Sequence, residues 1–334
     1  MHTLIIIHIG HRWPHYIKDC IHQARQVNPV EQVNIVFLVN GHHFQEVEEL
    51  EKIYHIQPVY IENLPVTKTH EEFLKTIVNL VDLQFRNKYW QYVFERFFLL
   101  EQYLLQTPTK SIYMIETDNL LYIPITKLAE TEQLFTQDIA LPFDSLERGY
   151  PSCMFFRKPS AVTKFVTYML DCLKQGNRSD MEILGKYRKE HSEEVFAYPV
   201  LPSECNTPAR ERRSQVGHTA TALQGKFLTD TRFPFVFDAI VYGQAVSGID
   251  PCNTGGRQSV GYRNESALYS IDEVRFQWRN CKDQWTPYAN ELPIVNLHIH
   301  SKALYCFLSD RKAMPKAEYN PKELETKLRL EYQG

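Results

Sequence analysis

The sequence predicts an α/β fold with a mostly parallel central sheet flanked by helices. In the first half of the chain, short apolar runs alternate with segments whose apolar residues recur every three and four positions. Strands that alternate with helices in this way are typical of βαβ units, which build parallel sheets. The second half is less regular, and we expect it to complete the same domain.

Local patterns predict each element of the first half. The run "TLIIIHIG" at 3–10 predicts a buried strand, because it is short, apolar and closed by a glycine. The stretch 69–106 has helical spacing and predicts one long helix or two, opened by a cap in which Thr69 pairs with Glu72. The other expected elements are helices at 15–27 and 43–54, and strands at 32–40, 57–63 and 111–116.

The second half has fewer clear signals. Pro159 opens a helix expected to run to residue 175, and Ser179 or Asp180 caps a further helix. The polar, turn-rich segment 203–232 is long for a compact domain and predicts a lid or a binding loop. The remaining expected elements are strands at 138–144, 152–158, 195–202 and 293–302, a helix at 179–190, and a charged, partly helical tail from 311.

Composition excludes several classes of protein. The chain has 334 residues, with 43% hydrophobic and 23% charged, which is typical of a globular protein rather than a disordered one. A net charge of −3 argues against a non-specific nucleic-acid binder. We find no apolar stretch near the roughly 20 residues of a membrane span and no signal peptide, and the seven scattered cysteines favour a reducing compartment. We therefore expect a cytoplasmic protein, either free or peripheral to a membrane.

The stretch "SIYMIETDNLLY" at 111–122 turns from apolar to acidic where a buried strand should end. Glu116 and Asp118 stand two residues apart, and Asn119 follows. In open α/β sheets, ligands bind beyond the carboxyl ends of the strands. Two carboxylates at that edge can converge on Mg²⁺ or Mn²⁺, which prefer oxygen ligands. A solvated turn is the alternative interpretation, because acidic pairs of this kind are common.

A second group of candidate ligands lies near the end of the chain. His298 and His300 are two residues apart on an expected strand, so both should point to the same face. Imidazole is a common ligand of divalent transition metals, and Lys302 offers a point charge to a phosphate. A single strand histidine also fits an ordinary core position. Together with the two earlier carboxylates, however, His300 and Lys302 predict a site for a metal ion and a diphosphate.

Four blocks of sequence, in order, resemble the GT-A glycosyltransferases. "ERFFLLEQYLLQTPTKSIYMIETDNLLY" resembles the segment that leads into their DxD motif, with Arg96 at the arginine position and Glu116 and Asp118 at the acidic positions. "SDMEIL", "VLPSECN" and "NLHIHSK" resemble the later helix start, the Leu-Pro…Asn strand and the C-terminal His…Lys segment. "FDAIVYGQAVSGIDPCN" at 237–253 resembles a segment of bacterial and large-virus surface-glycan enzymes.

The resemblance implies a Rossmann-like GT-A fold and an enzyme that moves a sugar from a nucleoside-diphosphate sugar to an acceptor hydroxyl in glycan biosynthesis. The resemblance further implies a UDP- or GDP-sugar as donor, Mn²⁺ or Mg²⁺ as cofactor, and a glycan, a lipid-linked intermediate or a protein as acceptor. Residues 1–122 would form the nucleotide-sugar half, residues 123–310 the acceptor-binding and catalytic half, and residues 311–334 a charged tail.

Each candidate site residue then has an expected role. Asp180 and Asp238 also fit simple helix caps, so their catalytic role stays open beside that alternative. Trp13, after Gly10-His11-Arg12, is a ligand-facing candidate or a loop anchor. The full set is Glu116, Asp118 and His300 for the metal; His8, Gly10, Asn40, Arg96, Asn119 and Lys302 for the donor; and Asp180, Glu182 and Asp238 as candidate general bases.

Two other classes of protein fit part of the pattern. A sugar nucleotidyltransferase would share the sheet and the metal-binding acids, but it usually has a glycine-rich basic first loop, and "GHRWPHY" has one Gly and one Arg. A non-catalytic carbohydrate-binding protein on the same fold would not need the complete acidic, histidine and lysine set.

Overall fold

The structure is a computed structural model that describes residues 1–107, 109–205, 228–254, 260–262, 267 and 271–332. Of the loop expected over 203–232, residues 206–227 lie outside the described part of the chain. Within the described residues, none of the helices combines the length and the apolar character that crossing a membrane requires.

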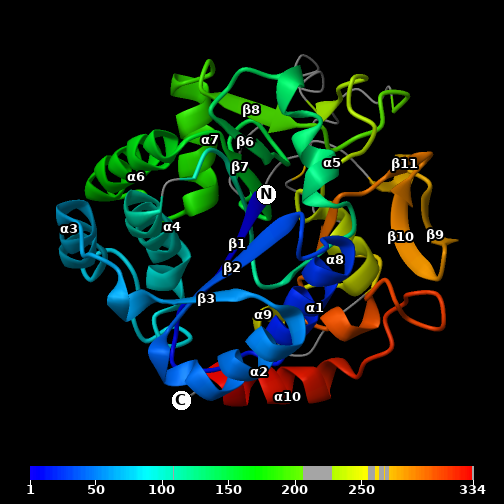
Figure 1. Ribbon diagram of the computed structural model, residues 1–334, viewed down its shortest axis with the longest axis horizontal. Helices are drawn as coiled ribbons and strands as arrows, with labels where there is room; N and C mark the ends of the chain where they lie inside the picture. Colours follow the sequence, from blue (N-terminus) through cyan, green and yellow to red (C-terminus); the bar gives the residue numbers. More distant parts are fainter. Residues whose placement is uncertain (108, 206–227, 255–259, 263–266, 268–270, 333–334) are drawn as a thin grey trace.

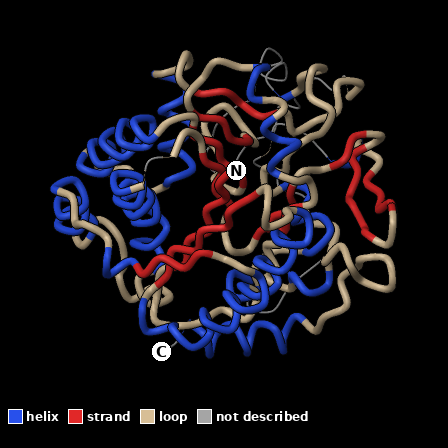
Figure 2. The backbone as a smooth tube through the Cα atoms, in the orientation of Figure 1, coloured by secondary structure: helices blue, strands red, loops and turns tan. Residues whose placement is uncertain are grey.

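A seven-stranded sheet with the order β3-β2-β1-β4-β7-β6-β8 forms the centre of the molecule, and Figure 2 shows its strands running between the helices. The first four strands are parallel, β7 is antiparallel to both of its neighbours, and β6 and β8 are parallel to each other. The predicted α/β fold with a mostly parallel central sheet is confirmed. The strands are β1 (His2–His8), β2 (Val33–Val39), β3 (Gln57–Tyr60), β4 (Ile112–Ile115), β6 (Ile139–Pro142), β7 (Cys153–Phe156) and β8 (Val195–Tyr198).

Helices cover both faces of this sheet (Figure 1). Along β1, Leu4 and Ile6 point into one apolar core and Ile5 into the other, because side chains alternate along a strand. The first core is completed by α1 (Ile17–Val27), α2 (Phe44–Tyr54), α5 (Ile125–Ala129), α8 (Val241–Ser247) and α10 (Pro321–Tyr332), and the second by α3 (Lys68–Ile77), α4 (Tyr89–Gln106), α6 (Pro159–Lys174) and α7 (Asp180–Glu190). The remaining short helices are α9 (Pro251–Thr254), η1 (Gly41–His43), η2 (Ile61–Asn63), η3 (Glu132–Leu134), η5 (Ile271–Glu273) and η6 (Leu304–Cys306).

Two small antiparallel sheets complete the fold. One pairs β5 (Asn119–Leu121) with β12 (Asn296–His298), which joins the end of the acidic stretch to the late histidines. The other consists of β9 (Phe276–Cys281), β10 (Gln284–Ala289) and β11 (Leu292–Pro293).

The strand expected over 293–302 is shorter than predicted, because β12 ends at His298. Beyond it the chain turns: the backbone N–H of Lys302 donates to the carbonyl of Ile299 at 2.9 Å, and Lys302 is left-handed with φ 66°. His300 and Lys302 therefore lie in a turn, and the prediction that His298 and His300 share the face of one strand is wrong.

The structure confirms the predicted cap of α7 but not that of α3. Ser179 caps α7, since its hydroxyl accepts the backbone N–H of Glu182 at 3.3 Å, as predicted. The stretch 69–106 contains two helices, but Thr69 does not cap the first. Thr67 does, because it is extended (φ −86°, ψ 154°) and accepts the N–H of His70 at 3.2 Å.

Candidate functional site

The acidic pair lies at the carboxyl end of β4. All four residues of β4 are buried, and the chain then turns so that the N–H of Asn119 donates to the carbonyl of Glu116 at 3.1 Å. In the β5–β12 ladder, Asn119 is paired with His298, and the N–H of Ile299 donates to the carbonyl of Asp118 at 2.9 Å. Backbone pairing between distant parts of the sequence thus places a histidine beside the two carboxylates.

Glu116, Asp118 and His298 form a compact group with ligand atoms all within 4.8 Å of one another. The imidazole lies between the two acids, with Nδ1 at 3.2 Å from Glu116 Oε2 and Nε2 at 3.0 Å from Asp118 Oδ2. Lys302 forms an ion pair with Asp118 from the other side. Asn119 is buried, and its amide nitrogen lies 3.3 Å from Nδ1 of His298, so Asn119 supports the ring instead of facing a cavity.

The charges in this group are strongly coupled. Burial opposes a charged imidazole, but the carboxylates of Asp118 and Glu116 outweigh it and raise the pKa of His298 to about 9. Burial would raise the pKa of the Asp118 carboxyl, yet the charges of His298 and Lys302 hold it well below its usual value. Both carboxylates are therefore ionised, and a metal ion bound between them would replace the proton that they hold on His298.

This donor set fits a divalent metal ion. Two carboxylate oxygens and one imidazole nitrogen are a combination that Mn²⁺ accepts, and they are close enough to reach one ion. Among the described residues, the histidine in this group is His298. His300 lines the same cavity, with its ring centroid 5.9 Å from that of His298, and its Nδ1 accepts the N–H of Asp250 at 2.9 Å. Burial lowers the pKa of His300 to about 3, so His300 is neutral.

Arg96 ties the acidic pair to the start of α7. Projecting from α4, it forms ion pairs with Glu116 and with Asp180, the latter with Nη2 at 2.6 Å from Oδ2. Asp180 is buried, and burial raises the pKa of its carboxyl although Arg96 acts in the opposite direction. Glu182, two residues after Asp180 in α7, is not among the described residues that line the two cavities described below.

Asp238, another candidate base, is not among the described residues that line the cavities. It is fully buried, and its carboxylate accepts the backbone N–H groups of Tyr242 and Gly243, both at 2.9 Å, and of His298 at 3.0 Å. Burial raises the pKa of this carboxyl to about 6, against the effect of these three hydrogen bonds. Asp238 thus joins α8 to β12 and positions His298, which matches the helix-capping alternative.

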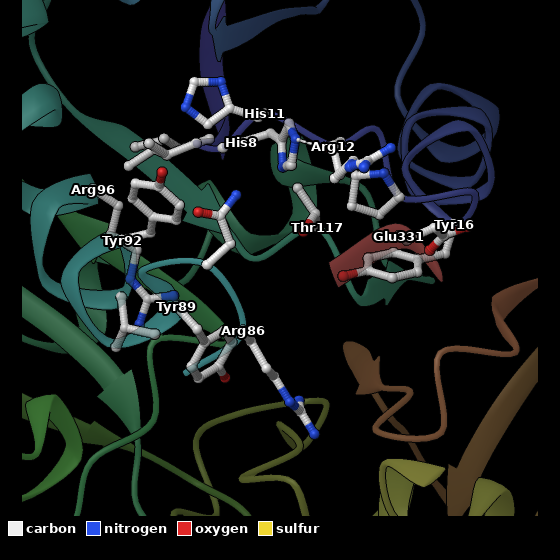
Figure 3. A pocket seen from close by; sticks show the side chains of 16 residues that line it. His8, His11, Arg12, Tyr16, Arg86, Tyr89, Tyr92, Arg96, Thr117 and Glu331 are labelled. Carbon is white, nitrogen blue, oxygen red and sulfur yellow. Dashed lines mark hydrogen bonds between the residues drawn. The ribbon is translucent and has the colours of Figure 1, made fainter. Parts of the chain in front are cut away.

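Two connected cavities open on this group. The acidic cavity, of about 350 Å³, is lined by Glu116, Asp118, His298 and Lys302, among others. The loop cavity, of about 150 Å³, is lined mainly by residues 7–12 at the end of β1 and in the loop that follows it, by the start of α4 and by Glu331 of α10 (Figure 3). Residues common to both linings are Ile7, Tyr16, Arg86, Tyr89, Val93, Arg96 and Thr117, so the two cavities are continuous.

Asn40 stabilises the loop after β1 through a hydrogen bond to its backbone. Gly10, with φ 138°, donates its N–H to Asn40 Oδ1 at 2.9 Å, and the amide of Asn40 donates to Glu62 at 3.0 Å. His8 donates from Nε2 to the carbonyl of Arg12 at 2.8 Å, closing the loop. Of the residues predicted for the donor, His8, Gly10, Arg96 and Lys302 line a cavity, whereas Asn40 and Asn119 are not among the described lining residues.

Sequence reasoning missed Arg86 and its partners. Arg86 lines both cavities, and its guanidinium donates to Asp250 at 2.7 Å and to Asn253 at 2.8 Å. In Figure 3 its side chain extends away from the His8 loop. Residues 78–88, which connect α3 to α4, lie in a stretch whose apolar spacing is helical, so no local sequence pattern marks Arg86 as part of a loop. His298, in contrast, was considered together with His300 and given no role of its own.

The chain matches no family model, and no curated protein matches it. Among solved structures, mouse xyloside xylosyltransferase 1 in its apo form is similar with 11% identity and a TM-score of 0.41, over 60% of this chain and 86% of that one. The galactosyltransferase LgtC in complex with donor and acceptor sugar analogs is similar with 12% identity and a TM-score of 0.43, over 61% of this chain and 76% of that one. The PaToxG glycosyltransferase is similar with 9% identity and a TM-score of 0.41, over 57% of this chain and 68% of that one. Identities and TM-scores this low assign neither a family nor an activity to the chain.

Proposed function

We propose that the chain is a metal-dependent glycosyltransferase that moves a sugar from a nucleoside-diphosphate sugar to an acceptor hydroxyl in glycan biosynthesis. One observation carries the proposal: Glu116, Asp118 and His298 form a largely buried group, suited to a cation, inside a cavity that continues into a second cavity at the end of β1. Ligand sites in open α/β sheets lie at this edge. The sequence resemblance to GT-A enzymes points to the same activity.

The two cavities divide the donor between them. The loop cavity would take the base and ribose of a UDP- or GDP-sugar, against residues 8–12 and Tyr92. Arg86 and Arg96 line both cavities, so their positive charge lies where a diphosphate would cross from one to the other. Lys302 adds a further cation in the acidic cavity. In this arrangement residues 1–122 supply most of the donor site.

Metal binding would use Glu116, Asp118 and His298, with His300 as a neighbour in the same cavity. A bound Mn²⁺ or Mg²⁺ would supply positive charge that stabilises the departing diphosphate.

The transfer exchanges one bond for another. The acceptor oxygen bonds to the anomeric carbon of the donor sugar, while the bond from that carbon to the diphosphate oxygen breaks and the nucleoside diphosphate leaves with the electron pair. The hydroxyl proton passes to a base. Of the three acids predicted for this role, Asp180 lines the acidic cavity, and its raised pKa suits proton transfer.

Hydrolysis of UDP- and GDP-sugars tests the proposal. We expect release of the nucleoside diphosphate to require Mn²⁺ or Mg²⁺ and to fall by about 100-fold or more in Asp118→Asn. A thermal shift with UDP or GDP that appears only with the metal would support the same site, since ligands that bind the folded state raise its apparent stability. Full activity in Asp118→Asn would rule out the proposed metal site, and no turnover or binding of any nucleotide sugar would rule out the enzyme.

A further inference from the structure

Three neighbouring aromatic side chains form a cluster at the start of α4 that the fold itself does not explain. Phe85, Tyr89 and Trp90 contact one another, with ring centroids 5.1 to 6.1 Å apart, and Phe85 and Trp90 are nearly parallel at 20°. Phe85 is 37% exposed and Tyr89 36%, and none of the three belongs to either apolar core within the described residues. We call these three residues the aromatic cluster. Exposed aromatic groups of this kind mark interaction sites more often than buried ones do.

The backbone that joins Phe85 to Tyr89 within the cluster adopts an unusual conformation. Arg86, Asn87 and Lys88 are consecutive left-handed residues, with φ 45°, 49° and 68°. None is a glycine, and each such residue costs about 1 kcal/mol or more relative to the right-handed form. The contacts of Arg86 with Asp250 and Asn253 hold this turn in place. Strain of this kind is concentrated at ligand sites, where a fixed shape is needed.

The aromatic cluster lies on the acidic cavity rather than on the loop cavity. Phe85 and Trp90 line the acidic cavity together with Asp118 and His298, and only Tyr89 also lines the loop cavity. A nucleobase in the loop cavity would therefore not reach Phe85 or Trp90. The group that they contact lies in the acidic cavity, beside the candidate metal ligands and beyond the nucleobase.

We propose that the aromatic cluster is the acceptor subsite and that the acceptor is a carbohydrate. This inference rests on the proposed glycosyltransferase activity. A pyranose ring has a face of C–H groups that packs on an aromatic ring, and hydroxyl groups around its edge that need hydrogen-bond partners. The cavity offers both, because polar side chains of Asp180, Asp250 and Asn253 line it beside the rings.

Other acceptors fit this surface less well. A lipid chain needs a continuous apolar surface, whereas charged Arg86 lies directly over the rings of Phe85 and Tyr89, at 5.3 and 5.8 Å from their centroids. The indole N–H of Trp90 donates no hydrogen bond that the structure shows among its described residues, so it remains for a ligand oxygen. Rings with a polar edge and a neighbouring cation match a sugar better than they match an acyl chain.

In the transfer, the sugar stacked on the aromatic cluster presents one hydroxyl to the anomeric carbon of the donor. A C–O bond forms between them as the donor sugar's bond to the diphosphate breaks, and the hydroxyl proton passes to a base such as Asp180. Stacking fixes which hydroxyl faces the donor, so Phe85 and Trp90 would be specificity-determining residues.

A printed glycan array, probed with the protein in the presence of Mn²⁺ and UDP or GDP, tests the inference directly. We expect a limited set of saccharides to bind. For the best of them, Trp90→Ala and Phe85→Ala should raise the Kd by about 10- to 100-fold, the range that stacking on one aromatic ring contributes, and far more than they raise the Kd of the nucleotide. Trp90→Phe keeps a ring and should recover most of the affinity.

Phe44→Ala is the matched control, since Phe44 is 53% exposed on α2 and lines neither cavity in the described linings. We expect it to change no saccharide affinity. Vesicles of phosphatidylcholine with undecaprenyl phosphate, and serine- and threonine-containing peptides, serve as the competing acceptors. The inference is overturned if Trp90→Ala and Phe85→Ala leave saccharide affinity unchanged, if no saccharide binds, or if only vesicles or peptides bind.

The two proposals fail in different ways. Saccharide binding that depends on Trp90, without binding or turnover of any nucleotide sugar, would leave a carbohydrate site and refute the glycosyltransferase. Turnover of a nucleotide sugar that depends on Asp118, with transfer to saccharides unaffected by Trp90→Ala, would leave the enzyme and refute the acceptor subsite.

Discussion

Arg96 and Asp180 form a buried ion pair, with Nη2 at 2.6 Å from Oδ2, although 84 positions separate them in the sequence. The same guanidinium also pairs with Glu116 at the end of β4. Asp180 is buried and Glu116 is partly buried, and arginine can serve two acids at once because its planar fork carries five N–H donors. One side chain of α4 therefore fixes the start of α7 relative to the candidate metal site.

Removal of this guanidinium should be costly. In Arg96→Met the buried carboxylate of Asp180 and the partly buried carboxylate of Glu116 lose their common partner, and we expect the free energy of unfolding to fall by about 3–5 kcal/mol in urea titrations. Arg96→Lys should recover only part of this, since an ammonium group cannot reproduce two paired contacts at fixed geometry. Combining Arg96→Met with Asp180→Asn should cost less than the sum of the two single changes. An Arg96→Met protein as stable as the parent would contradict this account.

The two late histidines should differ in their effect on metal binding. His298 contacts both Glu116 and Asp118, whereas His300 accepts a backbone N–H from Asp250. We expect His298→Gln to weaken Mn²⁺ binding by about 100-fold and His300→Gln to weaken it by about tenfold or less, measured by calorimetric titration. The reverse order would make His300 the ligand, as the sequence alone predicted.

Much of the fold was predictable because its signals are local. The strands β1, β2 and β4 are short apolar runs, and the helices between them carry their own spacing. The hairpin of β9 and β10 was missed. Its turn places Lys282 and Asp283 in the left-handed region, at φ 55° and 61°, without the Asn-Gly or Asp-Gly pair that usually signals such a turn.

The site was predictable only in part, because its assembly is not local. The acids after β4 and the importance of Lys302 follow from residue types near a strand end. Which histidine meets the acids depends on where β12 ends, and that is decided by pairing with Asn119 on a distant strand. The ion pair between Arg86 and Asp250 likewise joins two segments of the chain that no sequence pattern relates.

Gly243 should be intolerant of any side chain. A Cβ at this position in α8 would lie 2.0 Å from the carbonyl oxygen of His298 and 2.8 Å from Asp238 Oδ2. Because the first atom belongs to the backbone, we expect Gly243→Ala to lose about 3 kcal/mol of stability or more and to weaken Mn²⁺ binding, despite the better helix propensity of alanine. Gly41→Ala is the control, since its nearest contact is at 3.4 Å, with Glu62. Parent-like stability in Gly243→Ala would refute this close approach of α8 to β12.

Acid should destabilise the protein through His8. Burial lowers the pKa of His8 from 6.5 to about 3, and the nearby rings of His43 and His42 act in the same direction, against the hydrogen bond to the carbonyl of Arg12. The unfolded chain takes up a proton at this residue near pH 6.5, whereas the folded protein does so only near pH 3. Between these values the unfolded state binds more protons, so the free energy of unfolding falls by about 1.4 kcal/mol for each pH unit of acidification.

His8→Gln separates this contribution from those of other groups, because glutamine can still donate to the carbonyl of Arg12 but does not titrate. Urea titrations at about pH 7.5 and about pH 5 should show the parent losing about 2 kcal/mol more than the variant on acidification. The contributions of groups that lie far from residue 8 are the same in both proteins and cancel in the difference. Equal losses in the two proteins would mean that His8 is protonated in the folded state at mild acidity, and that the loop after β1 accommodates a charge which its burial argues against.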